Sequence, residues 1–348
     1  MRILVTGVAG RVGSTLAQHL VQAGHDVRGV VRPRGRLPHE SMMQHVGLVQ
    51  ADLSDTDALM RAVSGTDVVV HLAARMVMSD MPVEEFFDAN VTGTLRVLEA
   101  CVRQPTPPRR IVFASTDNVY GPAEPRSWPM TEEHPQVPGD YYGTSKVLGE
   151  ELVRNYGKLH GLPYVIVRLA SVLAPNETSS VCRLDWARSF VAAHVAANRR
   201  SNLWPLFADR LDVMSAMEAE AMGRRDNPAV ALTGPDGEPW AIHFTDVRDA
   251  VTGLMLAISD DAAVNNTFNI AGPRTTTFEE ASRALTQHLQ LDSVTLRLPV
   301  RLAFELSIDK AGRLLGYSPE WTFGRSLASG IGLADAHEVH DYVPVGEV

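Results

Sequence analysis

Short apolar runs alternate with longer amphipathic stretches along the first half of the chain. The apolar runs predict strands at residues 2–6, 26–31, 46–50, 67–73, 110–115 and 164–169. Helical periodicity fills the stretches 12–23, 55–64, 84–103 and 140–160. This alternation is typical of βαβ units, and strands as apolar as VVVHLAA are covered by helices on both faces. We therefore predict an α/β fold with a doubly wound parallel sheet, in which only residues 32–45 have no predicted element.

The pattern loosens after residue 175 and predicts a second, smaller lobe. Helical patterns occur at 183–199, 246–259 and 277–290, a strand pattern at 266–270, and a turn signal, GPDGEP, at 234–239. Asp246 stands where it would cap the helix that follows. We assign residues 1–175 and 228–273 to the sheet-containing domain. Residues 176–227 and 274–348 are assigned to a substrate-binding lobe.

Composition narrows the class of protein. The 348 residues are 45% hydrophobic and 21% charged, which is ordinary for a globular protein with a large core. A formal net charge of −9 argues against nucleic-acid binding. The chain has no apolar run long enough for a membrane span, and its first strand leaves no room for a signal peptide. Cys101 and Cys182 form no disulfide framework, so we expect a cytoplasmic protein.

A glycine-rich segment, TGVAGRVG, follows the first predicted strand and opens the first predicted helix. Gly7 would allow the tight turn, Gly10 a close backbone approach, and Gly13 tight packing of helix on strand. The amides of a helix N-terminus, here including Arg11 and Val12, can bind a pyrophosphate. In this context the motif predicts a Rossmann-type dinucleotide site.

The end of the second strand bears on which dinucleotide binds. An acidic residue there normally holds the adenosine ribose of NAD, but this strand ends in Arg32. A guanidinium can bind the 2′-phosphate of NADP, so NADP is favoured and NAD remains possible. Asp52, after the third strand, is placed either to hydrogen-bond the adenine or to cap the next helix.

Two further patterns suggest catalysis. The strand at 110–115 ends in consecutive polar residues, Ser115 to Asn118, which are not the residues of an ordinary turn. Tyr142 and Lys146 are four residues apart in a helical segment and so lie on one helix face. A nearby ammonium and a bound nicotinamide would lower the pKa of a tyrosine from about 10 and let it exchange protons. Taken alone, that spacing is more typical of a surface helix than of a catalytic pair.

Taken together, these features resemble the extended short-chain dehydrogenases/reductases of the NAD-dependent epimerase/dehydratase family. The motifs that carry the resemblance occur in the family's order: TGVAGRVG, HLAA (71–74), ANVTGT (89–94), STDNVYG (115–121), YYGTSK (141–146), VRLASVLAP (167–175), IHFTDV (242–247) and FNIAG (268–272). The resemblance implies that Thr116 is the catalytic hydroxyl, that Tyr142 transfers the proton, and that Lys146 binds the ribose. It also implies that Asn90 holds a relay water, unless Asn90 is merely a polar residue on an exposed helix face. Leu53, Leu72, Ala73 and Ala74 are implied to contact the cofactor.

The resemblance also narrows the reaction. Sugar dehydratases of the family carry Thr-Asp-Glu where this chain has Thr116, Asp117 and Asn118, and an asparagine cannot be the general base. Nucleotide-sugar epimerases bind the diphosphate at positions held here by Ser171 and Pro239. We therefore expect a dehydrogenase or reductase acting on a small sugar, polyol, lactone or ketone. An epimerase with a retained cofactor is the alternative, and a non-catalytic NAD(P) sensor is disfavoured by the intact triad.

Remaining features concern the pocket, the assembly and metals. Trp204, Phe207 and Trp240 are candidate pocket walls, although aromatics are more often core residues. Helices 84–103 and 140–160 carry apolar residues on more than one face, and in relatives they pair across a two-fold axis, so we expect a homodimer. His337 and His340 lack a strong third ligand, and no metal site is predicted.

Overall fold

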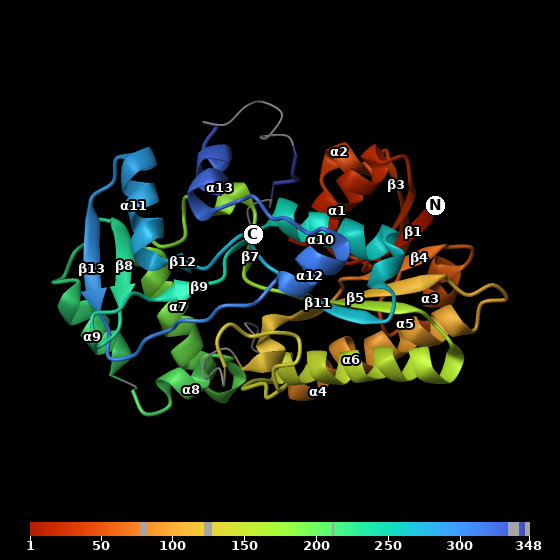
Figure 1. Ribbon diagram of the computed structural model, residues 1–348, viewed down its shortest axis with the longest axis horizontal. Coiled ribbons are helices and arrows are strands. Elements are labelled where there is room, and N and C mark those ends of the chain that lie inside the picture. Colours follow the sequence, from red (N-terminus) through yellow and green to blue (C-terminus); the bar gives the residue numbers. More distant parts are fainter. Residues whose placement is uncertain (77–81, 122–126, 211, 333–340, 345–348) are drawn as a thin grey trace.

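A seven-stranded parallel sheet forms the centre of the molecule (Figure 1). The computed structural model describes residues 1–76, 82–121, 127–210, 212–332 and 341–344. The strands run in the order β11-β6-β5-β4-β1-β2-β3. Their bounds are β1 Arg2–Thr6, β2 Asp26–Val31, β3 Val46–Gln50, β4 Val68–His71, β5 Arg110–Thr116, β6 Tyr164–Leu169 and β11 Asn266–Ile270. The predicted fold class and all six predicted strands of the first half are confirmed.

Alternation along each strand explains why the strands are apolar throughout. Ile3 and Val5 pack on one side of the sheet with α1 (Arg11–Gln22) and α10 (Val247–Ser259). Leu4 points to the other side, which is covered by α3, α5 and α6. These three helices span Thr56–Val63, Gly93–Val102 and Tyr141–His160. Successive side chains of a strand alternate between faces, so a sheet covered twice needs apolar residues at every position.

The predicted helix at 84–103 is divided into three parts. It begins as α4 (Val83–Phe87), continues as a π-helical segment (Asp88–Thr92), and ends as α5. The unassigned stretch 32–45 contains only a four-residue helix, α2 (Glu40–Met43). The turn at 234–239 is confirmed, with Gly237 at a positive φ and its amide donating to the Gly234 carbonyl. Asp246 caps α10, as predicted.

The second lobe, at the left of Figure 1, consists of α7, α8, α9, α11 and a small parallel sheet. Its elements are α7 Leu184–Ala197, α8 Trp204–Phe207, α9 Val213–Glu220, β8 Ala229–Thr233, α11 Phe278–Leu289 and β13 Ser293–Arg297. Short strand pairs lie between the two parts: β7 (Val172–Leu173) with β10 (Thr245–Asp246), and β9 (Ala241–Ile242) with β12 (Thr276–Thr277).

The proposed domain boundaries need two corrections. Residues 229–233 were assigned to the sheet-containing domain, but β8 pairs with β13 in the second lobe. Conversely, α12 (Asp309–Leu315) was assigned to the second lobe but packs against β11 of the central sheet. A buried strand pattern does not reveal its pairing partner, because partner and register are tertiary properties.

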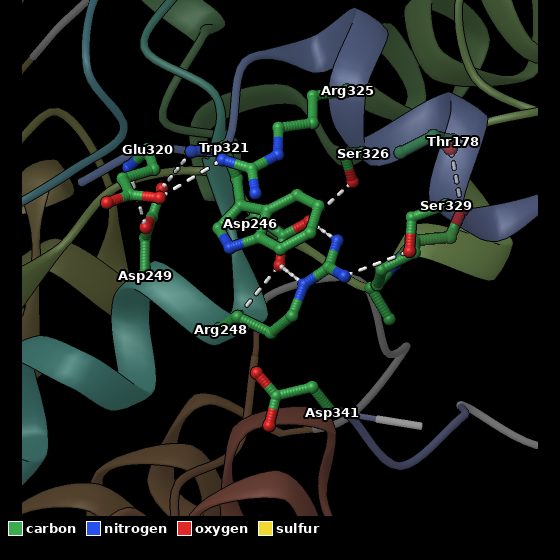
Figure 2. A network of polar contacts seen from close by, with 12 residues as sticks. Thr178, Asp246, Arg248, Asp249, Glu320, Trp321, Arg325, Ser326, Ser329 and Asp341 are labelled. Carbon is green, nitrogen blue, oxygen red and sulfur yellow. Dashed lines mark hydrogen bonds and ion pairs between the residues drawn. The ribbon is translucent and has the colours of Figure 1, made fainter. Parts of the chain in front are cut away.

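A buried ion pair ties the C-terminal region to the N-terminus of α10 (Figure 2). The guanidinium of Arg248 donates two hydrogen bonds to Asp246, at 2.7 and 2.9 Å, and a third to Ser329 of α13 (Phe323–Gly330). Its carbon lies 3.1 Å from the ring centroid of Trp321. Asp249, in the first turn of α10, accepts hydrogen bonds from the backbone amides of Glu320 and Trp321. The segment that leads into α13 is thereby fixed to the N-terminus of α10.

Candidate active site

A cavity of about 590 Å³ lies between the carboxyl ends of the sheet strands and the second lobe. Pockets in open α/β sheets form at this edge, where the strand order reverses. The reversal here falls between β1 and β4. Among the predicted site residues, the following line the cavity: Gly7, Gly10, Arg11, Val12, Gly13, Leu72, Ala74, Thr116, Asp117, Asn118, Tyr142, Lys146 and Ser171.

The glycine loop leaves room for a phosphate because side chains are absent from it. Gly7 has φ +74°, and a Cβ there would lie 2.9 Å from the Ala73 amide nitrogen. A Cβ on Gly13 would lie 2.2 Å from the Gly7 carbonyl oxygen. The first turn of α1 carries no acidic residue, and its amides give the helix end a partial positive charge. The loop therefore fits the pyrophosphate of a dinucleotide.

A chain of buried hydrogen bonds fixes the neighbouring end of β4. His71 contacts Thr6 through Nδ1 at 2.7 Å and Thr94 through Nε2 at 3.1 Å. The Thr94 hydroxyl donates to the carbonyl of Asn90, so it must accept its hydrogen bond from Nε2 of His71. Nδ1 is then the acceptor for the Thr6 hydroxyl, which in turn accepts from the amide of Ala73. Burial lowers the pKa of His71 to about 3, so the ring is neutral, as this arrangement requires.

The polar end of β5 forms the floor of the site. Thr116 and Asp117 are both buried, and the Thr116 hydroxyl donates to Asp117 Oδ1 at 2.9 Å. The same hydroxyl oxygen caps the short 3₁₀ helix Asp117–Tyr120 by accepting from the amide of Asn118. The side-chain oxygen Oδ1 of Asn118 accepts a hydrogen bond from Nδ2 of Asn202, in the second lobe, at 2.9 Å. The polar run is therefore explained: it lines the cavity.

Tyr142 and Lys146 lie on the first turns of α6, on the face toward β5. The Lys146 ammonium donates to the Ala114 carbonyl at 2.8 Å and lies 5.9 Å from the centroid of the Tyr142 ring. Burial lowers the pKa of Lys146 to about 8, although the charge of Glu150 opposes the shift. Phe86 of α4 makes an edge contact with the Tyr142 ring at 6.4 Å. The tyrosine is thus held by its neighbours while its ring lines the cavity.

Two carboxylates set the electrostatics beside Tyr142. Burial raises the pKa of Asp117 to about 6. Burial also raises the pKa of Asp140 to about 7, and the charge of Asp117 adds to that shift. Asp140 caps α6 by accepting from the amide of Gly143 at 2.6 Å, while its Oδ2 is buried without a hydrogen-bond partner. Burial raises the pKa of Tyr142 well above its usual value, and both carboxylates contribute.

Asn90 is buried in the π-helical segment and does not line the cavity. Its side-chain oxygen accepts from the Arg75 amide at 2.7 Å, and its Nδ2 donates to the Arg75 carbonyl and to Ser145 of α6. It therefore links the loop after β4 to the helix that carries Tyr142 and Lys146. The exposed-helix-face alternative is wrong, because tertiary contacts bury this face. π-Helical turns commonly occur at functional sites.

All three aromatic residues predicted as pocket walls need correction. Trp240 is fully buried in the second lobe, where its Nε1 donates to the Val300 carbonyl at 2.8 Å. Phe207 is also a core residue, and Trp204 is not among the described residues that line the cavity. The wall is instead made largely by Trp186 and Phe190 of α7, which stack with ring centroids 4.8 Å apart, and by Phe278 of α11.

Four predicted cofactor residues, Arg32, Asp52, Leu53 and Ala73, lie outside the cavity lining. Arg32 is exposed at the end of β2, and its positive charge contributes to lowering the pKa of Asp52, although hydrogen bonds from Ser54 are the main cause. Asp52 does not cap the next helix, since Asp55 holds that position. Leu53 packs against α5 at Gly93.

The pair His337 and His340 lies outside the described residues.

Sequence reasoning missed Asp140, Asn202 and the aromatic wall. Asp140 had a local signal, because an aspartate directly before a helix is a typical N-cap. The aromatic residues had no such signal, since α7 and α11 are far apart in sequence. Only the packing of the second lobe brings them together.

Comparison with known proteins places these features in one family. Residues 3–271 match the model of the NAD dependent epimerase/dehydratase family. An L-arabinose 1-dehydrogenase (NAD(P)(+)) from Haloferax volcanii is 34% identical over 272 residues, covering 74% of this chain and 94% of that protein. A UDP-glucose 4-epimerase from Azospirillum brasilense is 35% identical over 176 residues, 49% of each chain. The chain therefore spans about half the length of that epimerase.

Solved structures agree with the fold. A short-chain dehydrogenase/reductase superfamily protein from Agrobacterium tumefaciens, solved with bound NAD, superposes with a TM-score of 0.81 at 28% identity. The superposition covers 95% of this chain and 96% of that one. A UDP-glucose 4-epimerase from Thermotoga maritima gives a TM-score of 0.70 at 22% identity, over 94% and 96% of the two chains, which supports the fold alone. No helix within the described residues combines the length and apolarity of a membrane span.

Proposed function

Because the chain belongs to the NAD-dependent epimerase/dehydratase family, we propose that it is an NAD(P)-dependent oxidoreductase that acts on a secondary alcohol or ketone. The observation that carries the proposal is the convergence of Thr116, Tyr142 and Lys146 on one cavity with the glycine loop. A bound nicotinamide dinucleotide would supply the hydride acceptor or donor. The protein would supply the proton transfer and hold the reacting carbon in place.

Each member of the triad has a chemical task in this proposal. The phenolate of Tyr142 takes the alcohol proton when the substrate is oxidised, and the phenol returns that proton when the ketone is reduced. The Lys146 ammonium, at 5.9 Å from the Tyr142 ring, favours the phenolate by its charge. The Thr116 hydroxyl, now donating to Asp117, can donate to the substrate oxygen instead. The residues of the glycine loop would hold the pyrophosphate.

The small number of cationic side chains that line the cavity favours net redox chemistry over epimerisation. Among the described residues that line the cavity, the only lysine or arginine side chains are Arg11 and Lys146, both beside the glycine loop and the triad. Ser171 lines the cavity without a charge. A diphosphate is normally held by cationic side chains, so a substrate without a nucleotide fits better. The half-length similarity to UDP-glucose 4-epimerases keeps an epimerase with retained cofactor as the second candidate.

A Tyr142→Phe variant tests the proposal, with Tyr141→Phe as a matched control. Removing the Tyr142 hydroxyl should reduce turnover by 100-fold or more and leave cofactor affinity almost unchanged, because only the proton-transferring oxygen is lost. Tyr141 is exposed on the same helix, so its variant should behave as wild type. Lys146→Met should weaken both turnover and cofactor binding.

The readout is a panel of secondary alcohols, sugars, polyols and lactones, followed by reduced-nicotinamide absorbance and by NMR of the products. Stoichiometric conversion of the cofactor supports an oxidoreductase. An isomerised product without net cofactor change would establish the epimerase instead. Near-normal turnover by Tyr142→Phe would refute the site.

We further propose that NADP binds more tightly than NAD. Arg32 is exposed at the end of β2, beside the glycine-loop strand, and a charge-assisted contact to a 2′-phosphate contributes about 1.5–3 kcal/mol. We expect at least a tenfold preference for NADP, lost in Arg32→Ala and kept in Arg313→Ala, whose arginine is exposed on α12. Calorimetric titration with both cofactors measures it. A preference for NAD that survives Arg32→Ala would contradict the assignment.

We also propose a cytoplasmic homodimer that pairs through α4, α5 and α6. Leu148 and Leu159 are exposed on α6, at 42% and 66% of their surface, which supports an apolar contact there. Light scattering should give twice the chain mass, and Leu148→Arg should give a monomer.

Cys101 and Cys182 are free and buried, as is usual in a reducing compartment. Cell fractionation tests that location.

A further inference from the structure

We infer that the substrate has an apolar, ring-containing body, with the reacting alcohol or ketone at one end and no phosphate or carboxylate. The inference rests on the proposed function, because it concerns the same cavity. It departs from the sugar and nucleotide-sugar substrates named for the relatives. What carries it is the wall that the second lobe presents to the triad.

One side of this wall is a continuous aromatic surface. Trp186 and Phe190 of α7 are stacked with an interplanar angle of 18°, and Trp186 also contacts Phe278 of α11, at 6.0 Å between centroids. All three line the cavity, and Trp186 and Phe190 remain partly exposed. Flat aromatic faces of this kind bind rings by stacking and edge contacts. They leave hydroxyl groups without partners.

Further apolar side chains line the half of the cavity on the second-lobe side. Ile242, Leu302, Phe304 and Phe323 line it, and they come from three separate segments of the chain. Leu302, Phe304 and Phe323 are at least nine-tenths buried in the absence of ligand. A pocket lined in this way binds ligands through apolar contact, with few polar groups to orient them.

The distribution of charged residues in the cavity excludes an anionic substrate group from the half on the second-lobe side. Arg11 is paired with Glu177, and Lys146 is bonded to the Ala114 carbonyl. Burial lowers the pKa of His194, which lines this half, to about 4, so the ring is neutral. The carboxylates that line the cavity within the described residues are Asp117 and Asp140, both beside the triad. A phosphate or carboxylate in the half of the cavity on the second-lobe side would thus have no counter-charge.

The half of the cavity on the second-lobe side carries three polar residues, Thr276, Thr277 and His194, and most of the other polar groups that line the cavity lie near the triad. Asn202 reaches Asn118 there, and Asp140 Oδ2 is buried without a partner. One or two hydroxyl groups can therefore be satisfied at the reacting end. Every further hydroxyl placed on the aromatic wall would lose its water without replacement and weaken binding by about tenfold. A polyhydroxylated sugar fits this distribution poorly, whereas a cyclic ketone fused to an aromatic ring fits it well.

The test compares 1-tetralone and 1-tetralol with L-arabinose and UDP-glucose, using the 348-residue chain. NADPH or NADH is supplied with 1-tetralone, and NADP or NAD with the other three compounds. We expect kcat/KM for the tetralone–tetralol pair to exceed that for arabinose by at least tenfold. Phe190→Asn should lower it by at least tenfold through KM, with unchanged cofactor affinity. Trp128→Ser, which alters an exposed tryptophan outside the cavity lining, should change nothing. Ligand-observed NMR of 1-tetralone provides a binding readout that is independent of turnover.

Each outcome separates the two proposals. Oxidation of arabinose with no binding of 1-tetralone would overturn the apolar-substrate inference and leave the oxidoreductase intact. Isomerisation of UDP-glucose without net cofactor change would overturn both. Binding of 1-tetralone that Phe190→Asn abolishes, with net cofactor conversion, supports both. If 1-tetralone neither binds nor reacts at millimolar concentration, the inference fails whatever else turns over.

Discussion

Two carboxylates, Asp117 and Asp140, lie beside Tyr142, although their negative charge opposes the ionisation that the proposed proton transfer needs. Burial raises the pKa values of Asp117 and Asp140 to about 6 and about 7, so near neutrality at least one of them is protonated in part of the population. A protonated Asp140 removes one of the charges that raise the pKa of Tyr142. The protonation state of this pair therefore tunes the tyrosine.

The Asp140→Asn variant isolates that effect. Asparagine is also a good N-cap, so α6 should keep its cap. The folded-state pKa of Asp140 is raised above its unfolded value of 3.8. Its stabilising contribution is therefore complete below pH 4 and is lost as the pH rises through about 7. In wild type the free energy of unfolding should fall between pH 5 and pH 8 by on the order of 2–4 kcal/mol more than in the variant.

Denaturant unfolding of the cofactor-free protein across that range measures the difference. We also expect the oxidation rate, which rises with pH as Tyr142 ionises, to rise at lower pH in the variant than in wild type, because the pKa of Tyr142 falls. Parallel stability curves for the two proteins would show that Asp140 does not titrate there.

At the scale of elements, backbone approach decides whether the first βα unit can hold a dinucleotide. A Cβ on Gly13 would lie 2.2 Å from the carbonyl oxygen of Gly7. The loop and α1 can therefore approach each other this closely only because residue 13 has no side chain. The π-helical segment performs a related task on the other side of the cavity. It turns Asn90 toward Arg75 and Ser145, which aligns α6 with the loop after β4.

Gly13→Ala should displace the glycine loop, because the atom in the way is backbone rather than a flexible side chain. We expect cofactor affinity to fall by 100-fold or more, or the protein to lose stability by several kcal/mol if the loop cannot move. Gly47→Ala is the control: its Cβ would meet nothing closer than the Val27 carbonyl at 3.8 Å. Cofactor titration together with thermal unfolding separates the two effects. Wild-type cofactor affinity in Gly13→Ala would contradict the close-approach argument.

At the scale of the molecule, the cavity depends on how the second lobe and the C-terminal region are held to the sheet. Phe323 of α13 lines the cavity, and α13 is joined to α10 through the network of Figure 2. Arg248 is central to that network, with only 2% of its side chain exposed. A buried ion pair is costly to break, because the remaining charge is left without compensation.

Arg248→Leu should therefore destabilise the protein by about 3–5 kcal/mol, since Asp246 would be left as an uncompensated buried charge. Arg283→Leu is the control, because Arg283 and its partner Glu279 are 68% and 60% exposed, and it should change stability by less than about 1 kcal/mol. Denaturant midpoints for both variants and wild type provide the measurement. Equal effects of the two substitutions would refute a structural role for the buried pair.

Features that depend on short stretches of chain were determined by the sequence alone. The parallel sheet follows from strands apolar at every position, the glycine loop from spacing next to β1, and the shared face of Tyr142 and Lys146 from the pitch of one helix. Family membership and fold class were predicted on these grounds and are confirmed.

Features that depend on contacts between distant segments were decided only by the tertiary structure. The pairing of β8 with β13, the burial of Trp240, and the meeting of α7 and α11 around Trp186 all join residues widely separated in sequence. The approach of Asp140 to Asp117 joins two elements in the same way. Local patterns encode which residues are apolar and which end a helix, but not which distant surfaces bury them. The meeting of Thr116, Tyr142 and Lys146 at one cavity was thus predictable, and the aromatic wall of that cavity was not.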